Sequence, residues 1–310
     1  MSAVKLGKIK LPGDGGSFDS FGISDLHQNS GTIYLANRRL SRIDMLDSEN
    51  DRYLASLDGM DNVSQIMICH DRDMAFSAIT GKKEIGVFKP GSEEHFLSIG
   101  IDIHPENMAF DWDRDLMMVI GKDDLHGHGK TVISVFQYPG LSKSAVPGLD
   151  GVPVFTRYDD LSDLFCVLTR NPCNLYFLSP KDGFRIVEEI HINDENVSSL
   201  ELCPASNRII AGTHDGKVIS IFRNDMPSEV FGKFREGVSR IRYNSLMNHL
   251  YVSFHNSKSL AIIDMETKKT RETIKAGSEI GEILFDPVHN KLYAVLPKIS
   301  SVEVYLDQGR

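Results

Sequence analysis

The sequence predicts an all-β fold built from seven similar units, and three observations lead to this prediction. First, one pattern is written twice between Ser239 and Tyr305, as RIRYNSLMNHLYVSFHNSKSLAIIDMETKKTRETIKAG and then as EILFDPVHNKLYAVLPKISSVEVY. Second, a large apolar residue in the middle of a short β-rich segment recurs every 41 to 48 residues. Third, each copy divides into four strand-like segments separated by turn residues, without helical periodicity.

The recurring apolar residue marks seven copies, at Tyr34, Phe76, Met117, Phe165, Ile210, Tyr251 and Tyr293. A unit of this kind cannot bury its apolar face alone, and four short strands at a period in the low forties are typical of a propeller blade. We therefore predict a seven-bladed β-propeller with four antiparallel strands per blade. The recurring column should be core packing between blades, not an aromatic binding surface. The predicted blades of this single domain, 1–310, cover approximately residues 21–58, 63–100, 107–148, 153–193, 197–236, 238–276, and 279–306 together with 4–11.

Within a copy, the four strands follow from the alternation of apolar and polar residues. In the sixth copy they are SRIRY, HLYVSF, SLAIID and TRETIK, and the turns between them are NSLMN, HNSK and METKK. The first turn of each copy repeatedly carries Asp, Asn or Pro, as in DPVHN, CPASN and HQNSG. These residues favour tight turns because they supply a side-chain acceptor or fix φ.

The seventh copy lacks its fourth strand, because only LDQGR follows VEVY. The segment from Val4 to Leu11, VKLGKIKL, precedes the first copy and resembles the fourth strand of the sixth. We predict that this N-terminal strand becomes the outer strand of the last blade. The ring would then be closed, with the chain ends side by side and without an open gap between the first and last blades.

The third copy is longer than the others. It carries GKDDLHGHGK, from Gly121 to Lys130, between its second and third strands, and YPGLSKSAVPGLDG, from Tyr138 to Gly151, after its third strand. Insertions in a propeller fall on loops, so we predict that both segments project from the disc.

Several copies resemble the YVTN-type β-propeller repeat. The strings HNKLYAVL and SSVEVY of the last copy match its pattern, as do NHLYVSF and SLAIID of the sixth, and the first copy fits through Tyr34, Ala36, Asn37, Ile43 and Asp44. The resemblance implies a propeller of the broad WD-repeat-like superfamily. The WD dipeptide itself is missing, since the single tryptophan, Trp112, lies in the turn FDWDRD. The family is functionally mixed, so the resemblance implies no particular activity.

Composition narrows the possible partners and compartment. A formal net charge of −9 argues against a general nucleic-acid or membrane-surface binder, because both usually carry a basic surplus. The four cysteines lie inside predicted strands without a CxxC pair, which indicates buried thiols in a reducing compartment. No apolar signal core or membrane-spanning segment is found, so we expect a cytoplasmic or nuclear protein, and a monomer by default.

A ring of basic residues is predicted around one mouth of the central channel. In a propeller the turn after the second strand and the connections between blades share one face. The turns on this face supply Arg38, Lys82, Lys122, Arg170, His214, His255 and Lys298. Such a ring would attract an anionic ligand or an acidic peptide. The blade connections offset it with Asp58, Asp61, Asp102, Glu106, Asp194, Glu195, Glu236 and Glu279.

Two groups of histidines raise the possibility of a metal. His214 and His255 occupy equivalent turns of adjacent copies, which could bring the imidazoles together, but two ligands do not make a zinc site. The insertion DDLHGHGK offers His126 and His128 beside Asp123 and Asp124, which could chelate a transition metal. A solvated interaction loop is the alternative for this segment.

The sequence contains no phosphate-binding loop, serine-hydrolase elbow or zinc-protease helix. It therefore favours a non-enzymatic scaffold, without a cofactor, that binds protein partners through the loop face and the segment Gly121 to Lys130. The alternative is a small-molecule or anionic-ligand binder, or a metal-assisted enzyme, that uses the channel mouth.

Overall fold

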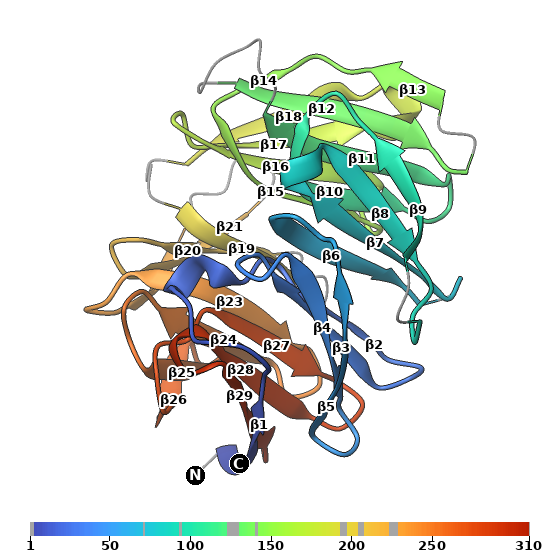
Figure 1. Ribbon diagram of the computed structural model, residues 1–310. Coiled ribbons are helices and arrows are strands. Elements are labelled where there is room, and N and C mark those ends of the chain that lie inside the picture. The colour runs from blue at the N-terminus through green and yellow to red at the C-terminus, as the bar shows by residue number, and fades with distance from the viewer. Residues whose placement is uncertain are drawn as a thin grey trace.

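The computed structural model describes residues 3–309 except 71, 93–94, 123–129, 140–141, 193–196, 204–207 and 223–228. Within these residues the chain forms seven antiparallel sheets, the blades, around a central channel (Figure 1). The predicted all-β, seven-bladed β-propeller is therefore confirmed. We number the blades along the chain, and the strands of each blade outward from the channel as first to fourth.

The first four blades use the N-terminal two thirds of the chain. Blade 1 consists of β2 (Asp25–His27), β3 (Thr32–Asn37), β4 (Arg42–Asp47) and β5 (Arg52–Asp58). Blade 2 consists of β6 (Val63–Cys69), β7 (Met74–Ile79), β8 (Glu84–Phe88) and β9 (His95–Gly100). Blade 3 consists of β10 (His104–Asp111), β11 (Leu116–Lys122), β12 (Lys130–Gln137), β13 (Ser142–Ala145) and β14 (Leu149–Asp150). Blade 4 consists of β15 (Val152–Asp159), β16 (Leu164–Arg170), β17 (Asn174–Ser179) and β18 (Arg185–His191).

The remaining blades follow the same order. Blade 5 consists of β19 (Val197–Cys203), β20 (Arg208–Thr213), β21 (Lys217–Ile221) and β22 (Glu229–Lys233). Blade 6 consists of β23 (Val238–Asn244), β24 (His249–Phe254), β25 (Ser259–Asp264) and β26 (Lys269–Lys275). Blade 7 consists of β27 (Glu282–Asp286), β28 (Lys291–Leu296), β29 (Ser301–Asp307) and β1 (Ala3–Lys10). Short 3-10 helices are η1 (Phe18–Ser20), η2 (Thr80–Lys82), η4 (Pro180–Asp182) and η6 (Pro297–Ile299).

The N-terminal strand closes the ring, as predicted. β1 pairs antiparallel with β29, with Ala3 opposite Asp307 and Lys10 opposite Ser301. Figure 1 shows the two chain ends together at the outer side of blade 7. The four strands of this blade are therefore contributed by both ends of the chain.

Blade 3 departs from the prediction. The segment Tyr138 to Gly151 was predicted to project as a loop, but Ser142–Ala145 pair with β12 as the fourth strand and Leu149–Asp150 pair with β12 as β14. The prediction was wrong because the polar sequence SKSA suits an outer strand, which needs no apolar face of its own.

The hydrophobic core lies between the blades. Each of seven buried clusters takes its residues from two adjacent blades, which explains why second strands such as β3 and β28 are buried along their whole length. All seven residues of the recurring apolar column are at most 2% exposed, so this column is core packing as predicted. The four cysteines are buried, also as predicted. In the described part of the chain, no helix has the length and apolar character needed to cross a membrane.

The alternation of strands produces two faces. We call the face that carries the turns between first and second strands the first-turn face. The opposite face carries the turns between second and third strands and the connections between blades, and we call it the second-turn face. The first turns are fixed by Asx side chains: in blade 6 the Asn244 Oδ1 accepts hydrogen bonds from the N–H groups of Leu246 and Met247, at 3.0 and 3.1 Å.

Candidate functional site

The central channel contains two cavities. The larger, which we call the wide cavity, has a volume of about 460 Å³ and is lined by residues from the first strands or first turns of all seven blades. Its outer lining includes Gln28, Trp112, Asp160, Ser245 and Pro287, all from first turns, so it opens on the first-turn face. The smaller, the narrow cavity, has a volume of about 110 Å³ and lies toward the second-turn face.

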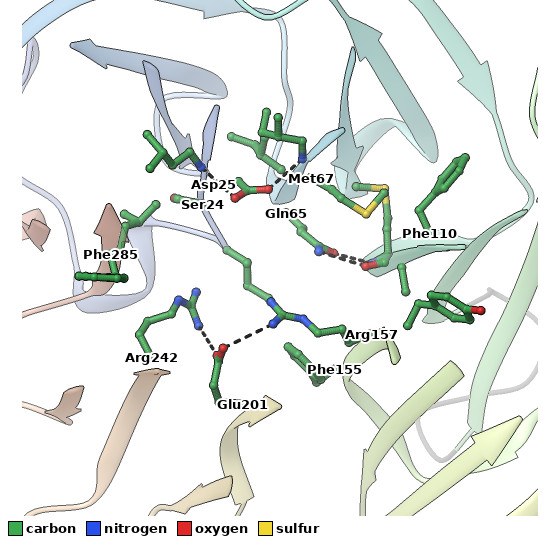
Figure 2. Close-up of a pocket in the computed structure, with 18 of the residues that line it drawn as sticks. Ser24, Asp25, Gln65, Met67, Phe110, Phe155, Arg157, Glu201, Arg242 and Phe285 are labelled. Carbon is green, nitrogen blue, oxygen red and sulfur yellow. Dashed lines mark hydrogen bonds and ion pairs between the residues drawn. The ribbon is translucent and has the colours of Figure 1, made fainter. Parts of the chain in front are cut away.

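The wall of the wide cavity combines apolar and polar side chains. Figure 2 shows Met67, Phe110, Phe155 and Phe285 arranged around the space. These side chains come from first strands, in which successive residues point to opposite faces of the sheet. The wall therefore offers apolar surface to a ligand or to an inserted side chain.

Charged groups also line the wide cavity (Figure 2). The Arg157 guanidinium lies 3.4 Å from the Glu201 carboxylate, and the Arg242 guanidinium lies 3.8 Å from the other oxygen of the same carboxylate. Arg157 keeps 46% of its side chain exposed, whereas Glu201 keeps 10%. Arg157 is therefore the charged group of this set that remains most available to a bound molecule.

Asp25 is the second acidic group of the wide cavity. Its carboxylate accepts hydrogen bonds from the N–H of Leu26 and from the N–H of Ile68 in the next blade, both at 2.8 Å. Burial raises the pKa of the Asp25 carboxyl, although both hydrogen bonds act in the opposite direction. The side chain thus joins blades 1 and 2 and gives the cavity a carboxyl that is easier to protonate than an exposed one.

Three exposed aliphatic residues lie beside the opening of the wide cavity, in the first turns of blades 4, 6 and 7. Leu161, Leu246 and Val288 are 71%, 59% and 60% exposed, and each is the third residue of a first turn that begins with Asp or Asn. The residue before each of them, Asp160, Ser245 and Pro287 respectively, lines the cavity. We call this opening, with its three aliphatic residues, the wide mouth.

The wide mouth is acidic where blades 3 and 4 meet. Burial and then the neighbouring carboxylates of Asp159, Asp113 and Asp111 raise the pKa of Asp160. Arg114 lies in the same region but is engaged by Asp111 and Asp163, both at 2.6 Å. The local potential at this side of the mouth is therefore negative.

The seven residues predicted from the sequence lie on the second-turn face, away from the wide mouth. Of these, Arg38 lines the narrow cavity. Lys122 and Lys298 form ion pairs with Glu106 and Glu279, at 3.7 and 2.8 Å. The Lys82 ammonium donates a hydrogen bond to the Gly59 carbonyl at 2.9 Å. Part of the basic ring is thus neutralised by the acidic blade connections.

The structure brings His214 and His255 together, as their equivalent positions predicted. The two rings stack with their centroids 4.4 Å apart. Burial, followed by the positive charge of Arg170, lowers the pKa of His214. The surroundings of the pair therefore favour the neutral form of the imidazoles.

No group of three or more metal-ligating side chains occurs among the described residues, so this pair has no third ligand there. The other metal candidates, His126 and His128 with Asp123 and Asp124, lie outside the described residues, as do Asp194 and Glu195.

Sequence reasoning missed the wide cavity, although two signals mark it. Charged residues stand inside predicted first strands, as Arg157 and Glu201 do. An aliphatic residue stands at the centre of the polar turns DDLSD, NSLMN and DPVHN. A charged residue is unusual inside a strand, and an aliphatic residue is unusual at the centre of a polar turn. The wide cavity accounts for both, because the charged residues line it and the aliphatic residues lie beside its opening.

The comparisons with known proteins identify the fold alone. No family model matches the chain, and no curated protein matches its sequence, so the YVTN-type repeat stays a prediction. Among solved structures, a hydrazine synthase chain from Kuenenia stuttgartiensis is 12% identical with a TM-score of 0.78, over 94% of this chain and 96% of that one. The β-propeller domain of Myceliophthora thermophila Cps50 (Swd1) is 10% identical with a TM-score of 0.77, over 98% of this chain and 99% of that domain.

Proposed function

We propose that this protein is a non-enzymatic β-propeller scaffold that binds a basic, apolar segment of a protein partner at the wide mouth. The observation that carries the proposal is the wide cavity, which has a volume of about 460 Å³, apolar side chains among the polar ones of its wall, and exposed aliphatic residues beside its opening. Binding sites for small molecules typically measure about 300–1,000 Å³ and combine apolar walls with a few polar groups. A side chain or short segment of a partner fits this range.

The rim supports docking of a protein surface rather than of a small molecule alone. Single exposed aliphatic residues are common on protein surfaces and need no explanation. Here Leu161, Leu246 and Val288 occupy equivalent turns beside one opening, and Asx hydrogen bonds hold each turn in place. A partner that covers the opening therefore buries all three with little cost for ordering loops.

Charge complementarity defines the partner segment. The carboxylates of Asp113, Asp159 and Asp160 give the rim a negative potential, and after burial it is the neighbouring carboxylates that raise the pKa of Asp160. A lysine or arginine of the partner would relieve this repulsion. The segment should therefore combine an apolar residue that enters the cavity with a basic residue near blades 3 and 4.

The second-turn face is the competing surface for a partner. The sequence predicted an acidic peptide there, bound by the basic ring. The ion pairs of Lys122 and Lys298 leave less free positive charge for a peptide than the sequence predicts. We therefore place the protein partner at the wide mouth and keep the basic ring as the comparison surface.

The test measures binding of labelled peptides that pair an aliphatic or aromatic residue with Lys or Arg, and of the same peptides with Glu in place of the basic residue. We expect the full-length protein to prefer the basic set. The triple variant Leu161→Ser, Leu246→Ser, Val288→Ser should bind at least about tenfold more weakly, because each exposed aliphatic residue covered by a partner contributes on the order of 1 kcal/mol or more.

A matched control changes three aliphatic residues on outer strands instead. Leu54→Ser, Val187→Ser and Val230→Ser remove side chains that are 43%, 49% and 53% exposed but lie away from the mouth. This control should bind as the unaltered protein does. Equal binding by the wide-mouth variant, or loss of binding only on charge reversal of Arg38, Lys122 and Arg170, would move the interface to the second-turn face.

A further inference from the structure

The narrow cavity is a separate polar space at the other end of the channel. It has a volume of about 110 Å³ and is lined by residues of several blades, among them Arg38, Arg240, Ser199 and Glu106. Ile23, Phe155 and Arg242 line both cavities and so lie between them. A space of this size holds several water molecules or one small ion with its oxygen atoms.

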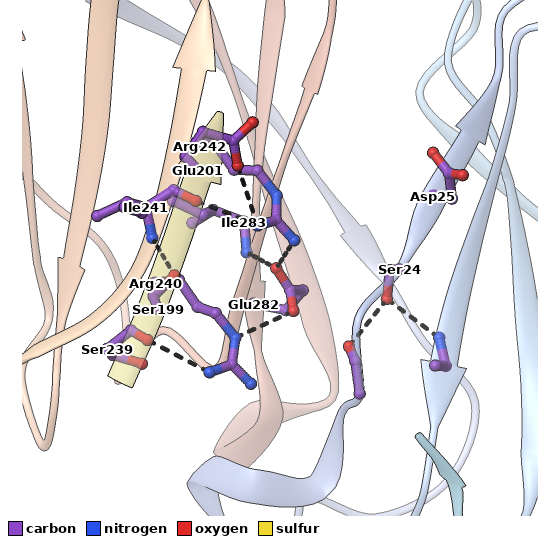
Figure 3. A network of polar contacts seen from close by, with 12 residues as sticks. Ser24, Asp25, Ser199, Glu201, Ser239, Arg240, Ile241, Arg242, Glu282 and Ile283 are labelled. Carbon is purple, nitrogen blue, oxygen red and sulfur yellow. Dashed lines mark hydrogen bonds and ion pairs between the residues drawn. The ribbon is translucent and has the colours of Figure 1, made fainter. Parts of the chain in front are cut away.

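Arginines outnumber their carboxylate partners around this space. The Glu282 carboxylate, which is fully buried, lies 3.2 Å from the Arg240 guanidinium and 3.0 Å from the Arg242 guanidinium. Figure 3 shows this carboxylate between the two arginines, with Glu201 on the far side of Arg242. Glu282 is thus shared by Arg240 and Arg242, and Arg242 shares Glu201 with Arg157, so these three arginines have two carboxylate partners.

Arg38 adds a further guanidinium. In the described part of the chain no carboxylate lies within ion-pair distance of it, and its Nε is buried without a hydrogen-bond partner. Its terminal nitrogen makes a long hydrogen bond of 3.4 Å to the Ser64 carbonyl. A guanidinium carries five N–H donors, so most of the hydrogen-bonding capacity of Arg38 is unused.

Burial and the charge of Arg240 act together on Arg38. Both lower the pKa of its guanidinium, with burial the larger effect, whereas the carboxylates of Glu106, Asp19 and Glu282 raise it. Among the described residues, Glu106 is the one carboxylate that lines the narrow cavity, and it already pairs with Lys122 at 3.7 Å. An anion in the cavity would compensate the charges of Arg38 and Arg240, which no protein group described here does fully.

Ser199 supplies a hydroxyl with an unused hydrogen. Its Oγ accepts a hydrogen bond from the Ile241 N–H at 3.1 Å, and the residue is 7% exposed. The neighbouring Ser198 hydroxyl faces two carbonyl acceptors, those of Gly212 and Val238. Ser199 is therefore the serine of this pair that can donate into the cavity.

We propose that the narrow cavity binds one small tetrahedral oxyanion, with inorganic phosphate as the simplest ligand, through the guanidinium groups of Arg38 and Arg240 and the hydroxyl of Ser199. Guanidinium and hydroxyl donors approach from different blades, which suits an ion with acceptors in several directions. This site lies at the opposite end of the channel from the wide mouth and is independent of the proposed partner binding.

The test is calorimetric titration of the full-length protein with phosphate, sulfate and acetate at constant ionic strength. We expect saturable binding of one phosphate or sulfate per chain, and at least about tenfold weaker binding of acetate, whose two oxygens leave donors unpaired. Arg38→Gln should weaken phosphate binding at least about tenfold, and Ser199→Ala about threefold or more.

Arg39→Gln is the matched control, because it removes the same charge from the next residue, which is exposed and does not line the cavity. Its phosphate affinity should equal that of the unaltered protein. Absence of saturable phosphate binding, or equal losses in the Arg38 and Arg39 variants, would overturn the proposal. Peptide binding at the wide mouth should be unchanged in Arg38→Gln, so failure of one site is distinguishable from failure of the other.

Discussion

The stacked imidazoles of His214 and His255 are sensitive to the charges around them. Burial, the His214 ring and the Arg240 guanidinium together lower the pKa of His255 to about 4. The ordinary value for a histidine is about 6.5. Above that pH the residue is neutral in both the folded and the unfolded chain, and it contributes no pH dependence to stability.

This difference predicts a loss of stability in acid. Between about pH 6.5 and pH 4 the unfolded chain binds a proton at His255 that the folded protein does not, so the free energy of unfolding falls as the pH falls. Because the side chain is partly exposed, we expect a contribution on the order of 1–2 kcal/mol rather than the full shift. Urea unfolding near pH 7.5 and pH 4.5 measures it.

His255→Gln should reduce that contribution, so the variant loses less stability than the unaltered protein over the same interval. His191→Gln provides the control, because it removes an exposed imidazole on β18 far along the chain from this pair. Identical pH dependence in His255→Gln and the unaltered protein would contradict the prediction.

At the scale of the element, the N-terminal strand has the largest structural role. Ile9 and Leu11 of this segment are 4% and 1% exposed and belong to the core cluster between blades 7 and 1. The Leu11 N–H donates a hydrogen bond to the Ser300 carbonyl at 2.8 Å, which continues the pairing beyond the end of β1. Removing the segment leaves β29 as an unpaired edge over an open core.

Deletion of residues 1–11 should therefore lower the free energy of unfolding by several kcal/mol, since burial of each large aliphatic side chain contributes about 1.5–3 kcal/mol. Thermal and urea unfolding measure the change. A synthetic peptide of residues 1–11 added in excess should restore part of the stability in a concentration-dependent way, and a scrambled peptide should not. A truncated protein that melts at the full-length temperature would contradict the role of β1.

The tyrosines of the repeat show how far the sequence could be interpreted at this scale. The period placed Tyr34, Tyr251 and Tyr293 correctly in the core. Their hydroxyls reach the next blade: Tyr34 accepts from the Gly91 N–H at 2.6 Å, and Tyr251 donates to Asp307 at 2.6 Å. The copies with Phe, Met or Ile at this position pack without that bond. The repeat period and the hydrophobicity of a segment predict that the tyrosine ring is buried. The hydrogen-bond partner of its hydroxyl depends on how adjacent blades stack.

At the scale of the whole molecule, the fold was predictable and the cavities were not. Seven repeats and one N-terminal strand that belongs to no repeat specify a closed ring. The last blade is complete only when this strand pairs with the third strand of the seventh repeat. The wide cavity depends on side chains such as Asp25, Arg157 and Glu201, which are far apart in the chain and unlike in type. These residues do not occupy a position that the repeat conserves. That they meet in one cavity therefore follows only from the closure of the seven blades into a ring.

Ring closure also predicts how a covalent bond between the chain ends would act. Val4 lies directly opposite Leu306 in the β1–β29 pairing. A disulfide between cysteines at these positions would link the ends of nearly the whole chain and constrain its unfolded state. Loops of this length favour a large entropic effect, and we expect stabilisation of about 2–4 kcal/mol. The four natural cysteines are buried, so they should not compete for the new bond.

The measurement compares oxidised and reduced Val4→Cys, Leu306→Cys protein by urea unfolding. The reduced form is the control, since it carries the same substitutions without the bond. The oxidised protein should unfold more slowly. The reason is that blades 7 and 1 can separate only after β1 has left β29, and the disulfide prevents this step. If oxidation left both the unfolding rate and the free energy unchanged, separation of these strands would not be the step that opens the ring.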